Sequence, residues 1–110
     1  MSSQASKSKG RNLDREQALA RLGECSAEMK AQGVRSLYMF GSTARGAARA
    51  ESDVDLFIET DPDSRFNAFD LVELKALLDR RLETKVDLST RDGLHPRLRA
   101  DIEGQAIRVF

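Results

Sequence analysis

Apolar residues recur along this chain with two different spacings, and the alternation between them predicts helices that alternate with strands. Spacings of three and four residues predict amphipathic helices from about Asn12 to Gly33 and from about Asn67 to Leu82. The second of these is expected to carry Phe69, Val72, Leu77 and a run of leucines on one side, with Phe69 in contact with the core or with a partner. Pro96 fits the first turn of a last helix that runs to about Glu103.

Short, largely apolar segments between these helices predict strands. They span Val34 to Phe40, Val54 to Glu59 and Lys85 to Ser89. The apolar end of the chain, Ile107 to Phe110, is expected to pack or pair with another segment, because an exposed apolar end is unfavourable. This order of elements predicts an α/β or α+β domain, with a small mixed β-sheet and helices packed on one side.

Length and composition indicate one domain with a polar extension. The chain has 110 residues, enough for a single hydrophobic core. Residues 1–11 are rich in Ser, Lys and Gly and have almost nothing to bury, so we expect a disordered tail there and the domain over residues 12–110. Cys25 lies on an apolar helical face and is expected to be a small buried hydrophobe.

The charge balance limits the classes of function. Lys plus Arg and Asp plus Glu both number 18, giving a formal net charge of zero. That balance argues against a strongly basic surface, and therefore against direct nucleic-acid binding as the main function. The sequence has no run near the ~20 apolar residues of a membrane span and no signal-peptide core, so we expect a cytoplasmic protein without a membrane partner.

The chemistry-bearing residues gather around the end of the first strand and the start of the second. Because successive side chains of a strand point to opposite faces, Asp53 and Asp55 share one face. Neighbouring carboxylates repel, and a cation normally offsets that repulsion. Oxygen ligands suit a hard ion such as magnesium, which commonly bridges carboxylates to substrate phosphates.

A Gly-Ser pair, Gly41 and Ser42, follows the first strand and supplies the other half of such a site. Glycine allows close backbone approach, and amides at the start of a following short helix, expected from Ser42 to Ala48, can hold an anionic phosphate together with the serine hydroxyl. The stretch therefore indicates a site for a metal ion and a triphosphate.

Gly41-Ser42, then ten residues, then Asp53-Val54-Asp55 resembles the signature of the DNA polymerase beta-like nucleotidyltransferase superfamily. The resemblance covers nearly the whole chain after the tail, and within the superfamily the chain is most similar to the minimal nucleotidyltransferase (MNT) group. It implies the nucleotidyltransferase fold and a third carboxylate on a later strand, for which Asp87 is the candidate.

The resemblance also implies a mechanism and a partner. Asp53, Asp55 and Asp87 would hold two magnesium ions for in-line attack of a hydroxyl on a nucleoside triphosphate, with Gly41 and Ser42 on its phosphates. MNT proteins resemble the antitoxin half of HEPN/MNT toxin-antitoxin pairs. The likeness thus implies transfer of AMP from ATP to a tyrosine of a HEPN ribonuclease toxin, within a homo- or hetero-oligomer.

Two other functions stay open at this level. One is nucleotide transfer to a small molecule, as in proteins similar to aminoglycoside-modifying enzymes, and the other is a binding-only antitoxin whose nucleotide site is vestigial. Arg45 and Arg49 could each contact a phosphate or be surface charges, since Arg suits that anion. The lone histidine, His95, is read as structural or partner-facing.

Overall fold

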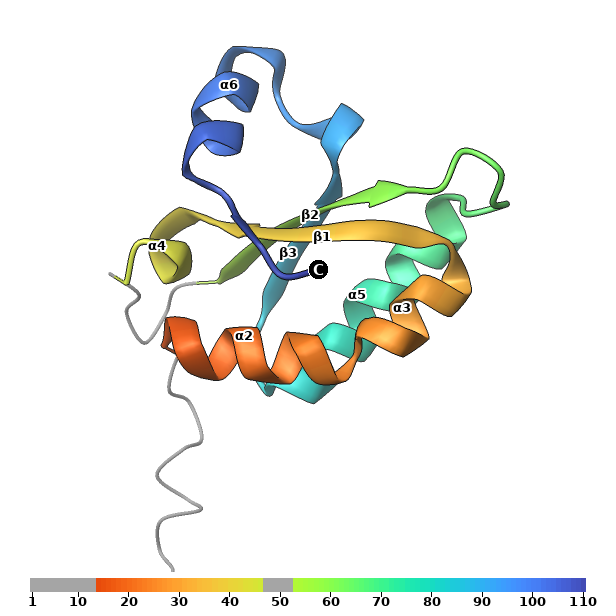
Figure 1. The fold of residues 1–110 in the computed structure, drawn as a ribbon, viewed down its shortest axis with the longest axis horizontal. Coiled ribbons are helices and arrows are strands. Elements are labelled where there is room, and N and C mark those ends of the chain that lie inside the picture. The colour runs from red at the N-terminus through yellow and green to blue at the C-terminus, as the bar shows by residue number, and fades with distance from the viewer. Residues whose placement is uncertain (1–13, 47–52) are drawn as a thin grey trace, which may run out of the picture.

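A four-stranded mixed sheet organises the protein, as the sequence predicts (Figure 1). This computed structural model describes residues 14–46 and 53–110, so the predicted tail, the cap at Asn12 and Arg49 lie outside the described residues. The strands stand in the order β3-β2-β1-β4, with β2 parallel to β3 and both other pairs antiparallel. Their bounds are β1 Val34–Phe40, β2 Val54–Thr60, β3 Val86–Thr90 and β4 Ile107–Arg108.

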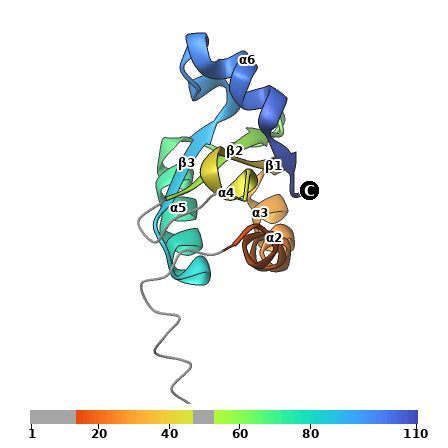
Figure 2. The ribbon, with the colours of Figure 1, turned by 90° about the vertical axis from the view of Figure 1, so that its left-hand side faces the viewer.

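The hydrophobic core lies between one face of this sheet and three helices. Helices α2 (Arg15–Glu24), α3 (Ser26–Gln32) and α5 (Ala68–Leu82) gather on that face (Figures 1 and 2). Register places the inward side chains of neighbouring strands opposite one another, so that they form one apolar layer. The fully buried or nearly buried members of this layer are Leu37, Met39, Val54, Leu56, Ile58, Val86 and Leu88. The predicted packing of helices on one side is confirmed for these three helices and is wrong for the last helix of the chain, which lies on the other side of the sheet.

The first predicted helix is divided in two at Cys25. The division comes two residues after Gly23, a poor helix former, and both parts bury apolar side chains of the same core. Asp14 caps α2 through a capping box with Gln17. Cys25 is fully buried, as predicted, and Gly33 ends α3 with φ of 109°, a left-handed conformation that glycine adopts readily.

Helix α5 begins where the sequence indicates, with Asn67 as its cap, but its outward face was predicted wrongly. The buried stripe consists of Leu74, Leu78 and Leu82, at spacings of four residues. Phe69 and Val72 lie on the other side of the helix and are 82% and 66% exposed. Apolar residues occupy more than one side of this helix, so spacing alone did not show which side faces the sheet.

The second face of the sheet is covered by the C-terminal part of the chain. A single 3-10 turn, η1 (Arg91–Gly93), leads into helix α6 (Pro96–Gln105), which lies on the opposite side of the sheet from α2 and α5 (Figure 2). The end of the chain then returns to β1, where Phe110 accepts from the Leu37 amide and Val109 donates to the Leu37 carbonyl. The prediction that the apolar end pairs with another segment is therefore confirmed.

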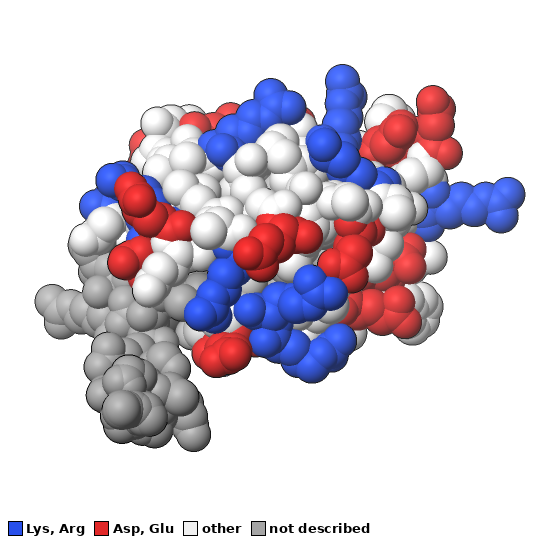
Figure 3. Space-filling view, turned by 60° about the horizontal axis from the view of Figure 1, so that its bottom comes forward, with Lys and Arg blue, Asp and Glu red and all other residues white. Residues whose placement is uncertain are grey.

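Charges of both signs are interspersed on the outer surface of the core helices. Figure 3 shows this face with Lys and Arg side chains alternating with Asp and Glu rather than forming one basic field. No helix within residues 14–46 and 53–110 combines the length and the apolar character that crossing a membrane requires.

Candidate active site

Two of the three predicted carboxylates are direct neighbours in the sheet. Asp55 on β2 pairs with Asp87 on the parallel strand β3, so both side chains project from the same face. Asp53 lies two residues before Asp55 and immediately before β2. Side chains two residues apart on an extended chain point to the same face, so Asp53 shares the face of Asp55. This face is opposite the hydrophobic core. The sequence-predicted juxtaposition is therefore present, and the catalytic role of the three residues stays a prediction.

Gly41 meets Asp55 across the next pair of strands. Phe40, the last residue of β1, is the register partner of Asp55, and Gly41 follows with φ of 75°. A Cβ atom placed on Gly41 would lie 2.2 Å from Asp55 Oδ2, closer than real Cβ contacts allow. Any other residue would therefore displace the carboxylate as well as strain the backbone. The glycine of the Gly-Ser pair is needed by the geometry of this corner.

The carboxylates destabilise one another's charged forms. The pKa of the Asp55 carboxyl is raised to about 6 by partial burial together with the negative charges of Asp87 and Asp53, and the positive charge of Arg45 acts in the opposite direction. Asp55 therefore sits in a field that a divalent cation would relieve.

The donor set fits a hard cation. Asp53, Asp55 and Asp87 offer carboxylate oxygens, the ligands that magnesium takes in proteins. Within the described ranges, no group of three or more His, Cys, Asp or Glu side chains is already arranged to hold a metal ion. Magnesium usually binds through one or two carboxylates together with phosphate and water oxygens, so a complete cage of protein ligands is not required.

The predicted phosphate-binding residues follow β1 directly. Helix α4 (Gly41–Ala44) is one turn long, shorter than the predicted helix to Ala48, and residues 47 and 48 lie outside the described residues. Gly41 and Ser42 are half-buried at its start, and Thr43 is buried with a hydroxyl that finds no hydrogen-bond partner among residues 14–46 and 53–110. The roles of Gly41 and Ser42 toward phosphate remain predictions.

Arg45 leaves α4 and contacts a residue that the sequence analysis missed. Its Nη1 donates to Gln105 Oε1 at 3.0 Å, a contact between residues 60 positions apart. Arg15 of α2 holds the same corner from another side, since its Nη1 donates to the Ala44 carbonyl at 3.1 Å. No local pattern marks Gln105, because it reaches Arg45 only through the packing of α6.

His95 plays the structural part that was assigned to it. Its Nδ1 accepts from the Arg97 amide at 3.1 Å and caps α6, while Pro96 occupies the first turn.

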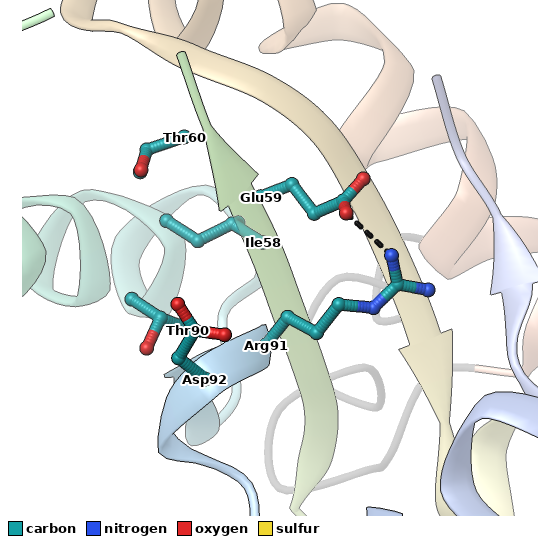
Figure 4. Close-up of a pocket in the computed structure, with 6 residues that line it drawn as sticks. All are labelled: Ile58, Glu59, Thr60, Thr90, Arg91 and Asp92. Atoms are coloured by element: carbon teal, nitrogen blue, oxygen red, sulfur yellow. Dashed lines mark hydrogen bonds and ion pairs between the residues drawn. The ribbon is translucent and has the colours of Figure 1, made fainter. Parts of the chain in front are cut away.

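A second polar cluster lies at the other end of the same strands. Arg91 extends from the end of β3 and forms an ion pair with Glu59 on β2 (Figure 4). A second ion pair joins Arg91 Nε to Glu103 Oε2 of α6 at 3.0 Å. The guanidinium also lies 5.5 Å from the ring centroids of Tyr38 and Phe57, within the range of a cation–π contact. The sequence analysis gave Arg91 no role.

A cavity of about 140 Å³ adjoins this cluster rather than the carboxylates. It lies at the carboxyl ends of β2 and β3, whereas Asp55 and Asp87 stand near the amino ends of those strands. Figure 4 shows Arg91 and Glu59 on one side of β2, with Ile58 and Thr60 on the other. The residues lining the cavity are Ile58, Glu59, Thr60, Thr90, Arg91 and Asp92. The cavity and the carboxylates are thus separate features, and the candidate active site rests on the chemistry of the carboxylates.

Comparisons with known proteins agree with this geometry. The family model described as "Nucleotidyltransferase domain" matches residues 22–109. The chain is 38% identical over 77 residues to "Putative protein adenylyltransferase MJ1379" of Methanocaldococcus jannaschii, an alignment that covers 69% of this chain and 77% of the relative. It is 35% identical over 78 residues to "Putative protein adenylyltransferase MJ0435" of the same organism, covering 71% of this chain and 82% of the relative.

Solved structures show the same fold. A structure described as that of a putative minimal nucleotidyltransferase superposes with a TM-score of 0.74 and 34% identity, covering 86% of this chain and 95% of the other. The complex of a tri-AMPylated Shewanella oneidensis HEPN toxin with its MNT antitoxin matches with a TM-score of 0.63 and 16% identity, covering 87% and 71% of the two chains. This chain belongs to the nucleotidyltransferase domain family, and its fold is that of the minimal nucleotidyltransferases.

Proposed function

We propose that this nucleotidyltransferase uses magnesium ions to transfer AMP from ATP to a hydroxyl group of a partner protein, and that the partner is a HEPN-type toxin. The observation that carries the proposal is the in-register pairing of Asp55 with Asp87, on the face of the sheet that Gly41 borders. This pairing places two carboxylates from different strands beside the corner that begins the Gly-Ser turn.

In the proposed reaction, the acceptor hydroxyl oxygen attacks the α-phosphorus of ATP. A new O–P bond forms while the bond between the α-phosphorus and the α–β bridging oxygen breaks, and pyrophosphate leaves. Asp87 receives the hydroxyl proton, which it can pass to water because its side chain is exposed. Two magnesium ions, held by Asp53, Asp55 and Asp87, would supply the positive charge that stabilises the attacking and leaving oxygens.

The residues of the α4 corner would bind the rest of the triphosphate. Gly41 lets the backbone approach the phosphates, and the Ser42 hydroxyl and the Arg45 guanidinium would donate to phosphate oxygens. Arg45 is suited to this role because its planar guanidinium offers several donors and keeps its charge at any working pH.

A protein acceptor is supported by what the relatives are. Both Methanocaldococcus jannaschii relatives are named as protein adenylyltransferases, at 38% and 35% identity. Several structures with the same fold are described as toxin-antitoxin structures, including one with AMP-PNP and one in which a tri-AMPylated HEPN toxin is in complex with an MNT antitoxin. We therefore place the AMP on a side-chain hydroxyl of the toxin, with tyrosine the first candidate.

The test uses two differently labelled forms of ATP. The purified protein is incubated with magnesium, a HEPN protein encoded in the same genome, and ATP labelled at either the α- or the γ-phosphorus. Nucleotide transfer predicts that the α-label appears on the HEPN protein and that the γ-label does not, because pyrophosphate leaves. Asp53→Asn and Asp87→Asn should abolish the label, and Asp101→Asn, at an exposed position of α6, should retain it.

Other outcomes would overturn the proposal. Transfer of both labels would show phosphorylation instead of nucleotide transfer. Label on an added aminoglycoside but not on the HEPN protein would show a small-molecule acceptor. Inhibition of the HEPN protein without any label would show an antitoxin that acts by binding alone.

A further inference from the structure

Arg45 is held by a neutral partner. In the described part of the chain, the side chain of Arg45 donates to the Gln105 amide oxygen at 3.0 Å. A carboxylate at this place would also hold the guanidinium but would cancel its charge. An amide oxygen occupies one of the five N–H donors and leaves the positive charge intact. The contact therefore fixes the direction of Arg45 and keeps its charge free for an anion.

The corner at Arg45 needs such a restraint. Arg45 follows the single turn of α4 and precedes Gly46, which has φ of 74°, and both residues are exposed. A free arginine side chain has many rotamers, and ordering it on phosphate would cost side-chain entropy. A contact that already holds the guanidinium near Asp55 removes part of this cost before the nucleotide arrives.

Gln105 is itself fixed from both sides. Glu103, two residues before it, forms the ion pair with Arg91, which is anchored on Glu59, Tyr38 and Phe57 of the sheet. Two residues after it, Ile107 is paired with Met39 of β1. Helix α6 itself contributes no fully buried side chain, and these two attachments lie on either side of its last turn.

We propose that Gln105 is a positioning residue of the nucleotidyl-transfer site, which holds the Arg45 guanidinium ready for the triphosphate of the incoming nucleotide. This inference rests on the proposed function, because it assumes that a nucleoside triphosphate binds beside Asp55. It assigns to α6, which lies far from the Gly-Ser pair in sequence, a direct part in nucleotide affinity.

The experiment measures binding of magnesium–ATP and the steady-state constants of transfer for Gln105→Ala, Gln105→Glu, Arg45→Ala and the double variant Gln105→Ala with Arg45→Ala. We expect Gln105→Ala to weaken nucleotide affinity and raise the KM for ATP by about 5-fold to 10-fold, which lies in the range of a typical net hydrogen bond, with a smaller change in kcat. In the Arg45→Ala background, the same substitution should have no further effect, because the group that it positions is gone.

Gln105→Glu separates positioning from simple packing. Its side chain has nearly the same shape, so a purely structural role predicts near-normal affinity. Positioning of a free charge predicts a loss at least as large as that of Gln105→Ala, because a carboxylate would neutralise Arg45. Arg99→Ala is the matched control on the same helix: its Nη2 donates to the Asp92 carbonyl at 3.1 Å, away from Arg45, and affinity should stay normal.

The outcomes distinguish the inference from the proposed function. If the unmodified protein does not bind magnesium–ATP, the proposed function fails and the inference fails with it. If it binds and Gln105→Ala binds equally well, or if the effects of Gln105→Ala and Arg45→Ala simply add, the inference alone is overturned.

Discussion

Asp55 and Asp87 are register partners on two parallel strands, and the carboxylate of Asp55 lies against Gly41 on a third segment. The pair therefore combines two costs that folding normally avoids: like charges side by side, and a carboxylate held away from water. A fold that keeps such a pair at one edge of its sheet carries repulsion that a bound cation can relieve. This relationship is the source of the first two predictions.

Replacing the Asp55 carboxylate should stabilise the metal-free protein at neutral pH. The folded protein raises the pKa of Asp55 from 3.8 to about 6, so its folded state binds a proton more tightly than its unfolded state. The free energy of unfolding should thus fall as pH rises from about 4 to about 6. Above pH 6, Asp55→Asn should raise the free energy of unfolding by on the order of 1 kcal/mol, a value reduced for solvent screening. Below pH 4 it should change the free energy of unfolding little.

Thermal melts in EDTA at pH 4, 5, 6 and 7.5 would check this sign. Asp101→Asn, at an exposed position of α6, is the control and should change stability little at any of these values. A variant Asp55→Asn that is less stable than the unmodified protein at pH 7.5 would contradict the electrostatic account of the site.

Magnesium should stabilise the protein mainly when ATP is present. The carboxylates can contribute only part of a magnesium coordination shell, and phosphate oxygens would supply more of it. We expect a larger rise in Tm with magnesium and ATP together than the sum of the two separate effects, and its loss on addition of EDTA. Asp87→Asn should abolish the joint effect while the fold is retained, as circular dichroism would show. Equal stabilisation by ATP without magnesium would argue against a metal-bridged site.

The strands and the shared face of the acidic residues could be predicted from the sequence, because the direction of a side chain on a strand depends only on its position along that strand. Asp53 and Asp55 share a face for the same reason that Val54 and Leu56 share the other, and β1 occupies exactly the predicted residues. The parallel pairing of Asp55 with Asp87 depended on the family resemblance, because pattern alone does not order strands in a sheet.

Contacts between distant segments could not be predicted. Gln105 meets Arg45 across 60 positions and Arg91 meets Glu59 across 32, and neither residue carries a periodic signal. The misplacement of Phe69 has a different cause: α5 has apolar residues on more than one side, so the leucine stripe had to be located by its packing against the sheet.

Adding a methyl group at three glycines should give three different results. Gly41→Ala should destabilise the protein by about 2–4 kcal/mol, because it combines a left-handed φ with a contact 2.2 Å from Asp55 Oδ2. Gly46 has φ of 74°, and no atom of the described residues lies within 4 Å of an added Cβ, so we expect Gly46→Ala to cost about 1–2 kcal/mol from backbone strain. Gly23→Ala, in helix α2 with open space around it, should be stabilising by about 0.5–1 kcal/mol.

Chemical denaturation of the three variants would rank them. The order Gly41, Gly46, Gly23, from most to least destabilising, is the expected result. If Gly41→Ala and Gly46→Ala cost the same, the close approach of Asp55 to Gly41 contributes nothing, and the account of that corner would be wrong.

Truncation of exposed and of buried side chains of α5 should change the free energy of unfolding by different amounts. Phe69→Ala is expected to change the free energy of unfolding by less than about 0.5 kcal/mol, because the ring is 82% exposed. Leu74→Ala should cost about 2–5 kcal/mol, because its side chain is fully buried and leaves a cavity. A large loss in Phe69→Ala in the isolated protein would mean that the ring contributes to the core despite its exposure.

The ion pairs of Arg91 should hold α6 on the sheet. Arg91→Ala removes the contacts to Glu59 and Glu103 together and uncovers Phe57, which is fully buried, so we expect a loss of about 1–3 kcal/mol. Arg81→Ala is the control, since Arg81 forms an exposed ion pair with Glu28 and donates to Cys25 Sγ at 3.4 Å, and its loss should cost less than that of Arg91. Hydrogen exchange measured by mass spectrometry should show faster exchange in α6 for Arg91→Ala and unchanged exchange there for Arg81→Ala. Equal protection of α6 in both variants would mean that the pairing of β4 with β1 holds this helix without Arg91.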